Sequence, residues 1–162
     1  MLTNTRSALV SGGRRPIRKH AELASEIERL LTFGIGITAR AIDQTPQAAD
    51  LTLVQWRVLV IASQAHGLRI GELAAHLGIS IPSASRLVRR IEVQGLLAAA
   101  RSDDDRRATN VAVTQAGRDM VQAVVRRRRE LIGLALSADA EDVPADAGRL
   151  IGQIADRLAE FA

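Results

Sequence analysis

The sequence predicts a mainly α-helical fold with one small β-hairpin. Apolar residues recur every three or four positions in six stretches, and one pair of short alternating segments flanks a charged tip. The 162 residues suffice for one compact domain with a single core. The chain has no cysteine, which excludes disulfides, thiolate catalysis and cysteine-ligated zinc. Its longest apolar runs, such as 58–62, are far shorter than the roughly 20 residues of a membrane span, so we expect a soluble, cytoplasmic protein.

The first 19 residues are expected to form a disordered basic arm. Few large apolar side chains occur in residues 1–17, which end near Pro16. The basic residues of the arm are Arg6, Arg14, Arg15, Arg18 and Lys19, with no acidic residue among them. A transit peptide has a similar Arg-rich, acid-poor composition and is the alternative interpretation.

An amphipathic helix is predicted from His20 to about Asp43. Its apolar positions follow the helical period, and it ends before Thr45-Pro46 because proline disfavours helical angles in the preceding residue. The residues that carry this pattern include Leu23, Ile27, Leu30, Leu31, Ile35 and Ile42.

Three helices are predicted between residues 52 and 94. Thr52 is the expected cap of the first, which runs to about Gln64 and is expected to be the central core helix because its apolar residues surround it. The second covers Arg69–Leu77 and closes at Gly78. The third begins at the N-cap Ser80 and stops at Gly95. The apolar residues of the core helix are Leu53, Val54, Val58, Leu59 and Ile61.

A β-hairpin and two further helices complete the predicted fold. The hairpin strands are 96–100 and 109–113, with the charged tip 101–107 between them. Thr114 is the expected cap of a long helix to about Leu136, and a last helix runs from about Ala145 to Phe161. We therefore expect one domain, 20–162, in which 51–113 form a compact lobe flanked by helices at 20–43 and within 114–162.

Positive charge is concentrated in the basic arm and in the centre of the chain. Residues 69–129 carry twelve basic and six acidic residues, whereas residues 130–162 carry two basic and seven acidic ones. All the basic residues except Lys19 are arginine, whose fork binds phosphate or guanine in a bidentate way. This distribution favours nucleic acid as a partner. The alternative is that arginine simply replaces lysine throughout an Arg-rich, Ala-rich proteome.

Residues 70–89 have the pattern of a helix-turn-helix. Small Ala74 lets the second helix approach the first, and Gly78 supplies a left-handed turn. The second helix then buries an apolar stripe and presents a polar outer face that a major groove admits. The expected DNA-binding residues on this face are Ser83, Ser85, Arg86, Arg89 and Arg90.

The hairpin tip combines Asp103–Asp105 with Arg106 and Arg107. A carboxylate holds a neighbouring guanidinium in place, so one arginine of the pair is free to enter a narrow, electronegative minor groove. The alternative is a solvated, salt-bridged turn without a partner.

The segment 72–120 is similar to the winged helix-turn-helix core of the multiple-antibiotic-resistance regulator (MarR) family. The residues that carry the resemblance are the junction Gly95-Leu96, the tip Asp105-Arg106-Arg107, Thr114 and Gly117, and also Gln55-Trp56 within 51–59. The resemblance covers roughly residues 22–161. The chain departs from the family's pattern at Ala98–Ala100, where the family often has basic residues.

The resemblance implies a homodimer in which the first, fifth and sixth helices interlock. Two recognition helices would then lie in successive major grooves of a pseudo-palindromic operator, about 34–36 Å apart. It also implies a wing salt bridge between Asp105 and Arg106, with Arg107 inserted into the minor groove. An effector pocket bordered by Phe33, Ile37, Trp56 and Arg57 follows from the same resemblance, although Trp56 also suits a purely structural place in the core.

Other candidate sites have simpler interpretations. His20, His66 and His76 lack metal-ligand spacing, so no metal site and no cofactor is expected. Gly34 and Gly36 lie within a helical pattern, which does not suit a dinucleotide loop. The run Arg126–Arg129 spans most of a helix circumference, so part of it faces solvent or pairs with Glu130, and partial phosphate contact is the alternative.

The sequence therefore predicts a homodimeric, sequence-specific double-stranded DNA-binding regulator of transcription, more specifically a repressor that responds to a small-molecule effector. The alternative from another class is a winged-helix protein-interaction module that does not bind DNA. An enzyme is disfavoured because no catalytic constellation is found.

Overall fold

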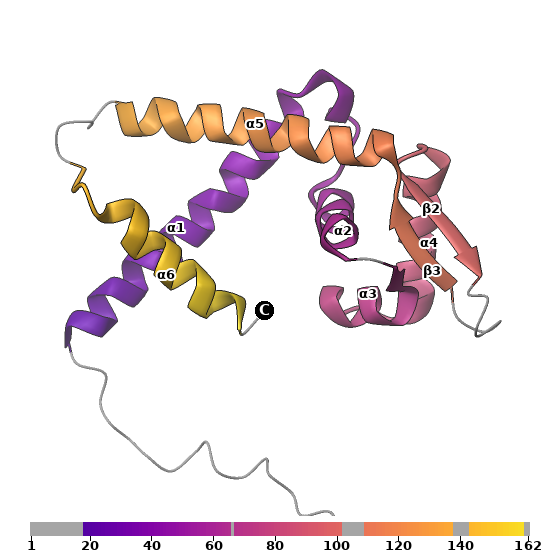
Figure 1. Cartoon of the computed structure of the whole chain (residues 1–162), viewed down its shortest axis with the longest axis horizontal. Helices are drawn as coiled ribbons and strands as arrows, with labels where there is room; N and C mark the ends of the chain where they lie inside the picture. The colour runs from indigo at the N-terminus through magenta and orange to yellow at the C-terminus, as the bar shows by residue number, and fades with distance from the viewer. Residues whose placement is uncertain (1–17, 66, 102–108, 138–142, 161–162) are drawn as a thin grey trace, which may run out of the picture. The chain divides into compact units, whose positions relative to one another are not determined.

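The computed structural model describes residues 18–65, 67–101, 109–137 and 143–160 (Figure 1). The chain divides into two compact units, residues 1–36 and 37–162, and each is described by itself. The elements in chain order are α1 (Arg18–Asp43), a 3-10 turn η1 (Pro46–Ala48), α2 (Leu53–Gln64), β1 (Leu68–Arg69), α3 (Ile70–Leu77), α4 (Ile81–Val93), β2 (Leu97–Arg101), β3 (Thr109–Val113), α5 (Gln115–Ser137) and α6 (Ala147–Ala159). The predicted fold class, mainly helical with one small sheet, is confirmed.

The described part of the first unit is the N-terminal portion of α1. This helix begins at Arg18, two residues before the predicted start at His20. Within the described residues of this unit, most apolar side chains of the helix are exposed, including Leu30 and Phe33. An exposed ion pair between Arg29 Nη1 and Glu26 Oε2, 2.7 Å long, lies on the same helix.

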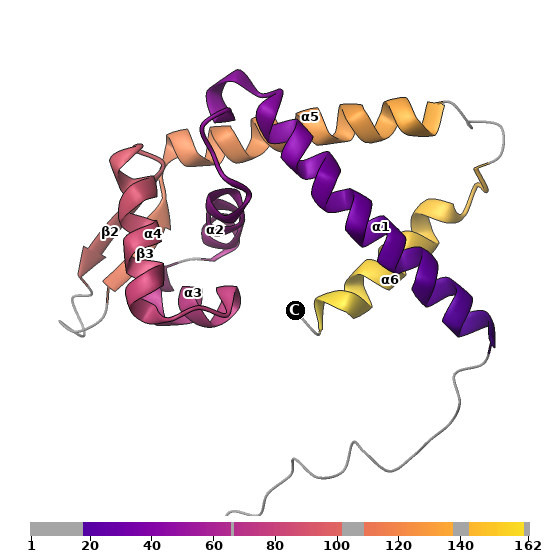
Figure 2. The same cartoon turned by 180° about the vertical axis from the view of Figure 1, so that it is seen from behind.

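The second unit is built around α2, which contacts α4, α5 and β3. Both views show α5 passing over α2, with the sheet at the N-terminal end of α5 (Figure 1 and Figure 2). Val58 and Leu59 of α2 are fully buried, and Trp56 is only 4% exposed. The prediction that α2 is the core helix is therefore confirmed for these positions.

The first turn of α2 differs from the prediction. Leu53 and Val54 were expected in the core but are 38% and 54% exposed. The buried residue of this turn is instead the polar Gln55, whose side chain forms part of the cap at the N-terminus of α2. Its Oε1 accepts from Thr52 N at 2.9 Å, and Thr52 Oγ1 accepts from Gln55 N at 3.2 Å, which together form a capping box. The capping role predicted for Thr52 is confirmed.

The three strands form one antiparallel sheet in the order β1-β3-β2. The hairpin predicted from the sequence corresponds to β2 and β3, with Leu97 opposite Val113 and Arg101 opposite Thr109. The strand β1 was not predicted because two residues are too few to show an alternating pattern. Leu68 of β1 lies opposite Val111, and both are buried, so this short strand closes the sheet over the core.

Thr114 connects α5 to the end of α4. Its Oγ1 accepts from Gly117 N at 3.1 Å and so caps α5 as predicted, while the same hydroxyl donates to the carbonyl oxygen of Gly95 at 2.8 Å. The Thr114 N–H also donates to the carbonyl oxygen of Leu96 at 3.1 Å. These bonds fix α5 to the segment that leads from α4 into the wing.

The helix α6 is shorter than predicted and contains no buried residue. Leu150, Ile151 and Leu158, predicted to share one apolar face, are all exposed. The predicted last residue of this face, Phe161, lies outside the described residues.

Two kinds of feature are absent from the described part of the chain. No helix in it is both long and apolar enough to cross a membrane. It also contains no cluster of three or more histidine or acidic side chains placed to hold a metal ion. His66 lies outside this part of the chain.

Candidate nucleic-acid interface

The helices α3 and α4 pack as the helix-turn-helix pattern predicted. Gly78 ends α3 in the left-handed conformation, with φ of 65°, and the Ile79 N–H donates to the carbonyl oxygen of Ala74 at 3.0 Å. Leu73 and Ala74 of α3 are buried against the second helix. The buried residues of α4 are Ala84, Val88 and Ile91, so the expected inner stripe is confirmed and the opposite face is presented outward.

The outer face of α4 contains an arginine-rich hollow. Arg86, Arg89 and Arg90 line a hollow of about 600 Å³, together with Gln55, Val93 and Gln94. No aspartate or glutamate occurs among the described residues that line it. The three guanidinium groups therefore present positive charge and hydrogen-bond donors that no carboxylate in the wall neutralises, which suits a polyanionic partner.

Ser85 lies in a different hollow from these arginines. This second hollow, of about 540 Å³, is also lined by residues of β1, α3, α4 and β3: Arg69, Ile70, Gly71, Glu72, Ile81 and Thr109. The predicted DNA-binding residues of α4 are therefore divided between two sides of the helix. The Glu72 carboxylate forms a hydrogen bond at the start of α3, where its Oε2 accepts from Arg69 N at 2.8 Å.

Ser83 forms the centre of a chain of hydrogen bonds on the first turns of α4. Ser80 Oγ donates to Ser83 Oγ at 3.0 Å, and Arg86 Nη2 donates to the same oxygen at 3.2 Å. The Ser83 N–H donates to Ser80 Oγ at 3.4 Å, so Ser80 is the N-cap that the sequence predicted. Two predicted DNA-binding residues, Ser83 and Arg86, are thus held together.

Gln55 and Gln94 were not among the predicted site residues. Gln55 Nε2 donates to Gln94 Oε1 at 3.5 Å, which joins the start of α2 to the end of α4 beside the arginine-rich hollow. These residues are 39 positions apart, so no local pattern links them. The one available signal was Gln55 three residues after the cap Thr52, which indicates a capping box.

The structure describes both strands of the wing, β2 and β3, but not the tip between them. Glu92 Oε1 of α4 accepts from Ala99 N of β2 at 3.1 Å and fixes the wing to the recognition helix. Asp105, Arg106 and Arg107 all lie outside the described residues, together with Asp103 and Asp104.

The residues predicted to border an effector pocket have different environments. Trp56 lies in the core, and Ile37 is half-buried near the end of α1. Arg57 is exposed, and its Nη2 donates to the carbonyl oxygen of His76 at 3.1 Å, so it satisfies an acceptor at the end of α3. Phe33 is an exposed residue of the first unit.

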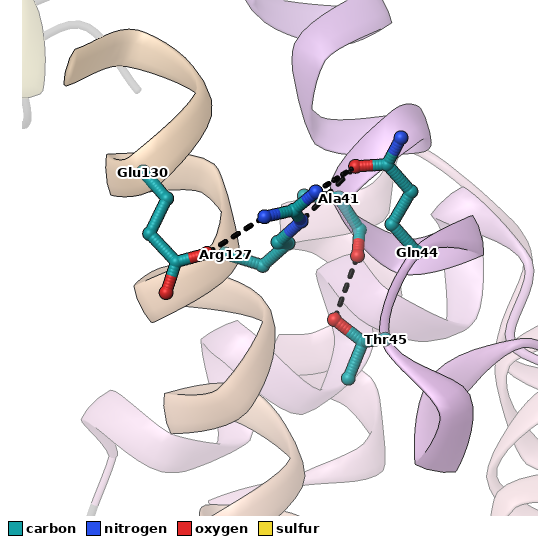
Figure 3. A network of polar contacts seen from close by, with 5 residues as sticks. All are labelled: Ala41, Gln44, Thr45, Arg127 and Glu130. Carbon is teal, nitrogen blue, oxygen red and sulfur yellow. Dashed lines mark hydrogen bonds and ion pairs between the residues drawn. The ribbon is translucent and has the colours of Figure 1, made fainter. Parts of the chain in front are cut away.

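The four arginines of the run Arg126–Arg129 on α5 differ in their contacts. Arg127 Nε and Nη2 donate to Gln44 Oε1 at 3.0 and 2.7 Å, and its Nη1 donates to Glu130 Oε2 at 2.8 Å (Figure 3). Arg128 Nη1 donates to Thr38 Oγ1 at 3.4 Å. These two arginines fasten α5 to the end of α1, whereas Arg126 and Arg129 are exposed. The expectation that part of the run pairs with Glu130 is confirmed.

The fold and this outer face define a winged helix-turn-helix protein with a basic recognition helix. Residues 51–109 match the sequence model of the MarR family, so this segment is similar to the domain of that family. A relative from Pseudomonas putida, the HTH-type transcriptional repressor IacR, is 27% identical over 114 residues, covering 70% of this chain and 59% of that protein. The family resemblance of the sequence is confirmed. The chain spans about three fifths or less of the length of the curated relatives it matches.

Solved structures share the fold over most of the chain. The crystal structure of RV1404 from Mycobacterium tuberculosis has a TM-score of 0.69 at 24% identity and covers 86% of this chain and 92% of that one. FabT from Streptococcus pneumoniae, solved in complex with DNA, has a TM-score of 0.65 at 13% identity and covers 88% and 96%. At these identities the similarity concerns the fold.

Proposed function

We propose that this protein is a sequence-specific double-stranded DNA-binding regulator of transcription, and more specifically a repressor, rather than an enzyme. The observation that carries the proposal is the hollow on α4 formed by Arg86, Arg89 and Arg90, whose described lining residues include no aspartate or glutamate. A recognition helix in the major groove needs such donors for base edges and phosphates. The relative IacR is a transcriptional repressor and FabT was solved in complex with DNA, and both support the same function.

We propose a homodimer as the binding form. Within the described residues, apolar side chains of three helices are left uncovered: Leu30, Leu31, Phe33 and Ile35 on α1, Ile132, Leu134 and Leu136 on α5, and Leu150, Ile151 and Leu158 on α6. Exposed apolar side chains that gather on a helix in this way mark an interaction site on each of these helices. If a second copy covers these side chains, a two-fold axis relates the two lobes 51–113 of the dimer. The operator that such a dimer binds would then be pseudo-palindromic.

The wing and the basic arm complete the proposed DNA contacts. The charges of residues 1–19 suit phosphate contacts, and the tip suits a salt bridge between Asp105 and Arg106 with Arg107 in the minor groove. A small-molecule effector bound near Ile37, Trp56 and Arg57 would act by preferring a dimer whose recognition helices are wrongly spaced. We also propose a cytoplasmic location, because a regulator of transcription acts where the DNA is.

The test is selection of random-sequence duplexes by the purified full chain at about physiological salt. We expect enrichment of an inverted repeat with half-sites about one helical turn apart. Affinity for the enriched duplex should fall by about 0.9 log unit per tenfold rise in salt for each phosphate contact. Enrichment without an inverted repeat would contradict the dimeric reading, and salt-dependent binding without enrichment would reduce the function to non-specific binding.

The alternative is a protein-interaction module that does not bind DNA. One observation favours it: Val93, beside the arginine-rich hollow, is 84% exposed, which suits an apolar contact. No DNA binding by the full chain at low salt, where phosphate contacts are strongest, would support this alternative over the regulator.

A further inference from the structure

Ser83 and Arg86 are both predicted to contact DNA, yet their hydrogen bonds indicate different roles for the two side chains. Ser83 Oγ lies 3.0 Å from Ser80 Oγ and accepts from Arg86 Nη2 at 3.2 Å. A hydroxyl proton rotates, so the contact between Ser80 Oγ and Ser83 Oγ can run in either direction, whereas the Arg86 guanidinium can only donate to Ser83 Oγ. Ser83 Oγ is therefore the acceptor that holds Arg86.

Arg86 is a donor by its chemistry. A guanidinium has five N–H groups and no acceptor, and only one of the five is used on Ser83. The side chain is exposed and lines the hollow that has no carboxylate among its described residues. The bond to Ser83 restricts its direction, so less side-chain freedom is lost when it binds.

We propose that Ser83 and Arg86 together read a guanine in each half-site, with Arg86 as the base contact and Ser83 as its positioning residue. The inference rests on the proposed function. Guanine presents two adjacent acceptors, N7 and O6, in the major groove, whereas adenine places an amino donor beside its N7 and cytosine presents a donor. The Arg86 guanidinium, which can only donate, is matched to guanine and opposed by the amino groups of adenine and cytosine.

The test begins with the enriched duplex from the selection experiment. We expect a guanine whose replacement by 7-deazaguanine, which lacks the N7 acceptor, weakens binding by the wild-type chain about tenfold. Replacement of that guanine by inosine, which keeps N7 and O6, should leave the affinity unchanged. The matched control is 7-deazaguanine at the other guanines of the duplex, which should have little effect.

Three variants then separate positioning from contact. Ser83→Ala favours the helix, so the chain is expected to fold, but it should lose about tenfold in affinity for the guanine duplex and little for the 7-deazaguanine duplex. Ser83→Thr keeps the hydroxyl and should restore the preference. Arg129→Lys, an exposed arginine of α5 that does not line the arginine-rich hollow, is the control and should keep both the affinity and the guanine preference.

The outcomes distinguish this inference from the function it rests on. No sequence-specific binding at all would overturn both. Specific binding without the 7-deazaguanine effect, or with the same guanine preference in Ser83→Ala as in the wild type, would overturn the reading by Ser83 and Arg86 and leave the regulator intact.

Discussion

Gly117, in the first turn of α5, lies directly against the backbone of Leu96. A Cβ added at Gly117 would overlap the carbonyl oxygen of Leu96 and lie 2.7 Å from Val113 Cγ2. The same carbonyl accepts the Thr114 N–H at 3.1 Å. The absence of a side chain at Gly117 therefore allows α5 to begin where the recognition helix passes into the wing.

Gly117→Ala should destabilise the fold by about 2 kcal/mol, because the added methyl group meets backbone that cannot move aside. The matched control is Gly71→Ala in α3, where a Cβ meets nothing within 4 Å. The control should raise stability by about 0.5–1 kcal/mol, since alanine favours a helix over glycine. Urea unfolding at one protein concentration measures both. Equal midpoints for the two variants would show that α5 has room to shift at Gly117.

Arg127→Met should lower the free energy of unfolding by about 1 kcal/mol, because it removes the two bonds to Gln44 Oε1 and the exposed ion pair with Glu130. The control is Arg129→Met in the same run, which is exposed and should change stability by less than about 0.5 kcal/mol. Thermal unfolding of both variants is the measurement. If the two lose the same stability, the contact between α5 and the end of α1 contributes nothing measurable.

The sequence predicted the parts of this fold that local chemistry determines. Ser80, Thr52 and Thr114 are caps because a short polar side chain bonds the backbone within three residues, and Gly78 is needed for a positive φ. Such signals lie within one or two turns of the chain. They placed the start of α4 correctly, at Ile81 after the cap Ser80.

Local signals of this kind do not predict contacts between segments that are far apart in the sequence. Apolar composition indicated burial of α2 but not that Val54 lies on its exposed side. The bond between Gln55 and Gln94 joins segments that only the fold brings together. Likewise, periodicity on α5 could not assign Arg127 to Gln44 and leave Arg129 exposed, because the four arginines differ only in what surrounds the helix.

Ile151→Glu should convert the proposed dimer to a monomer. Ile151 is an exposed apolar residue of α6, and a carboxylate buried there without a partner would oppose association strongly. We expect at least a tenfold rise in the dimer dissociation constant, measured by sedimentation velocity over a range of concentrations. The control is Gln153→Glu, an exposed polar position on the same helix, which should keep the wild-type mass. Identical masses for the two variants would remove this face of α6 from the interface.

Deletion of residues 1–17 should weaken DNA binding for all sequences alike. The segment contains three arginines, Arg6, Arg14 and Arg15, and no acidic residue, and a basic arm contacts phosphates rather than base edges. The loss of affinity should be largest at low salt, and the slope of log affinity against log salt should become shallower by up to about 2–3. The control is the chain in which these three arginines are replaced by glutamine, which should reproduce the deletion. Unchanged affinity in both would exclude the arm from binding, whereas a change in the selected sequence would show that it reads bases.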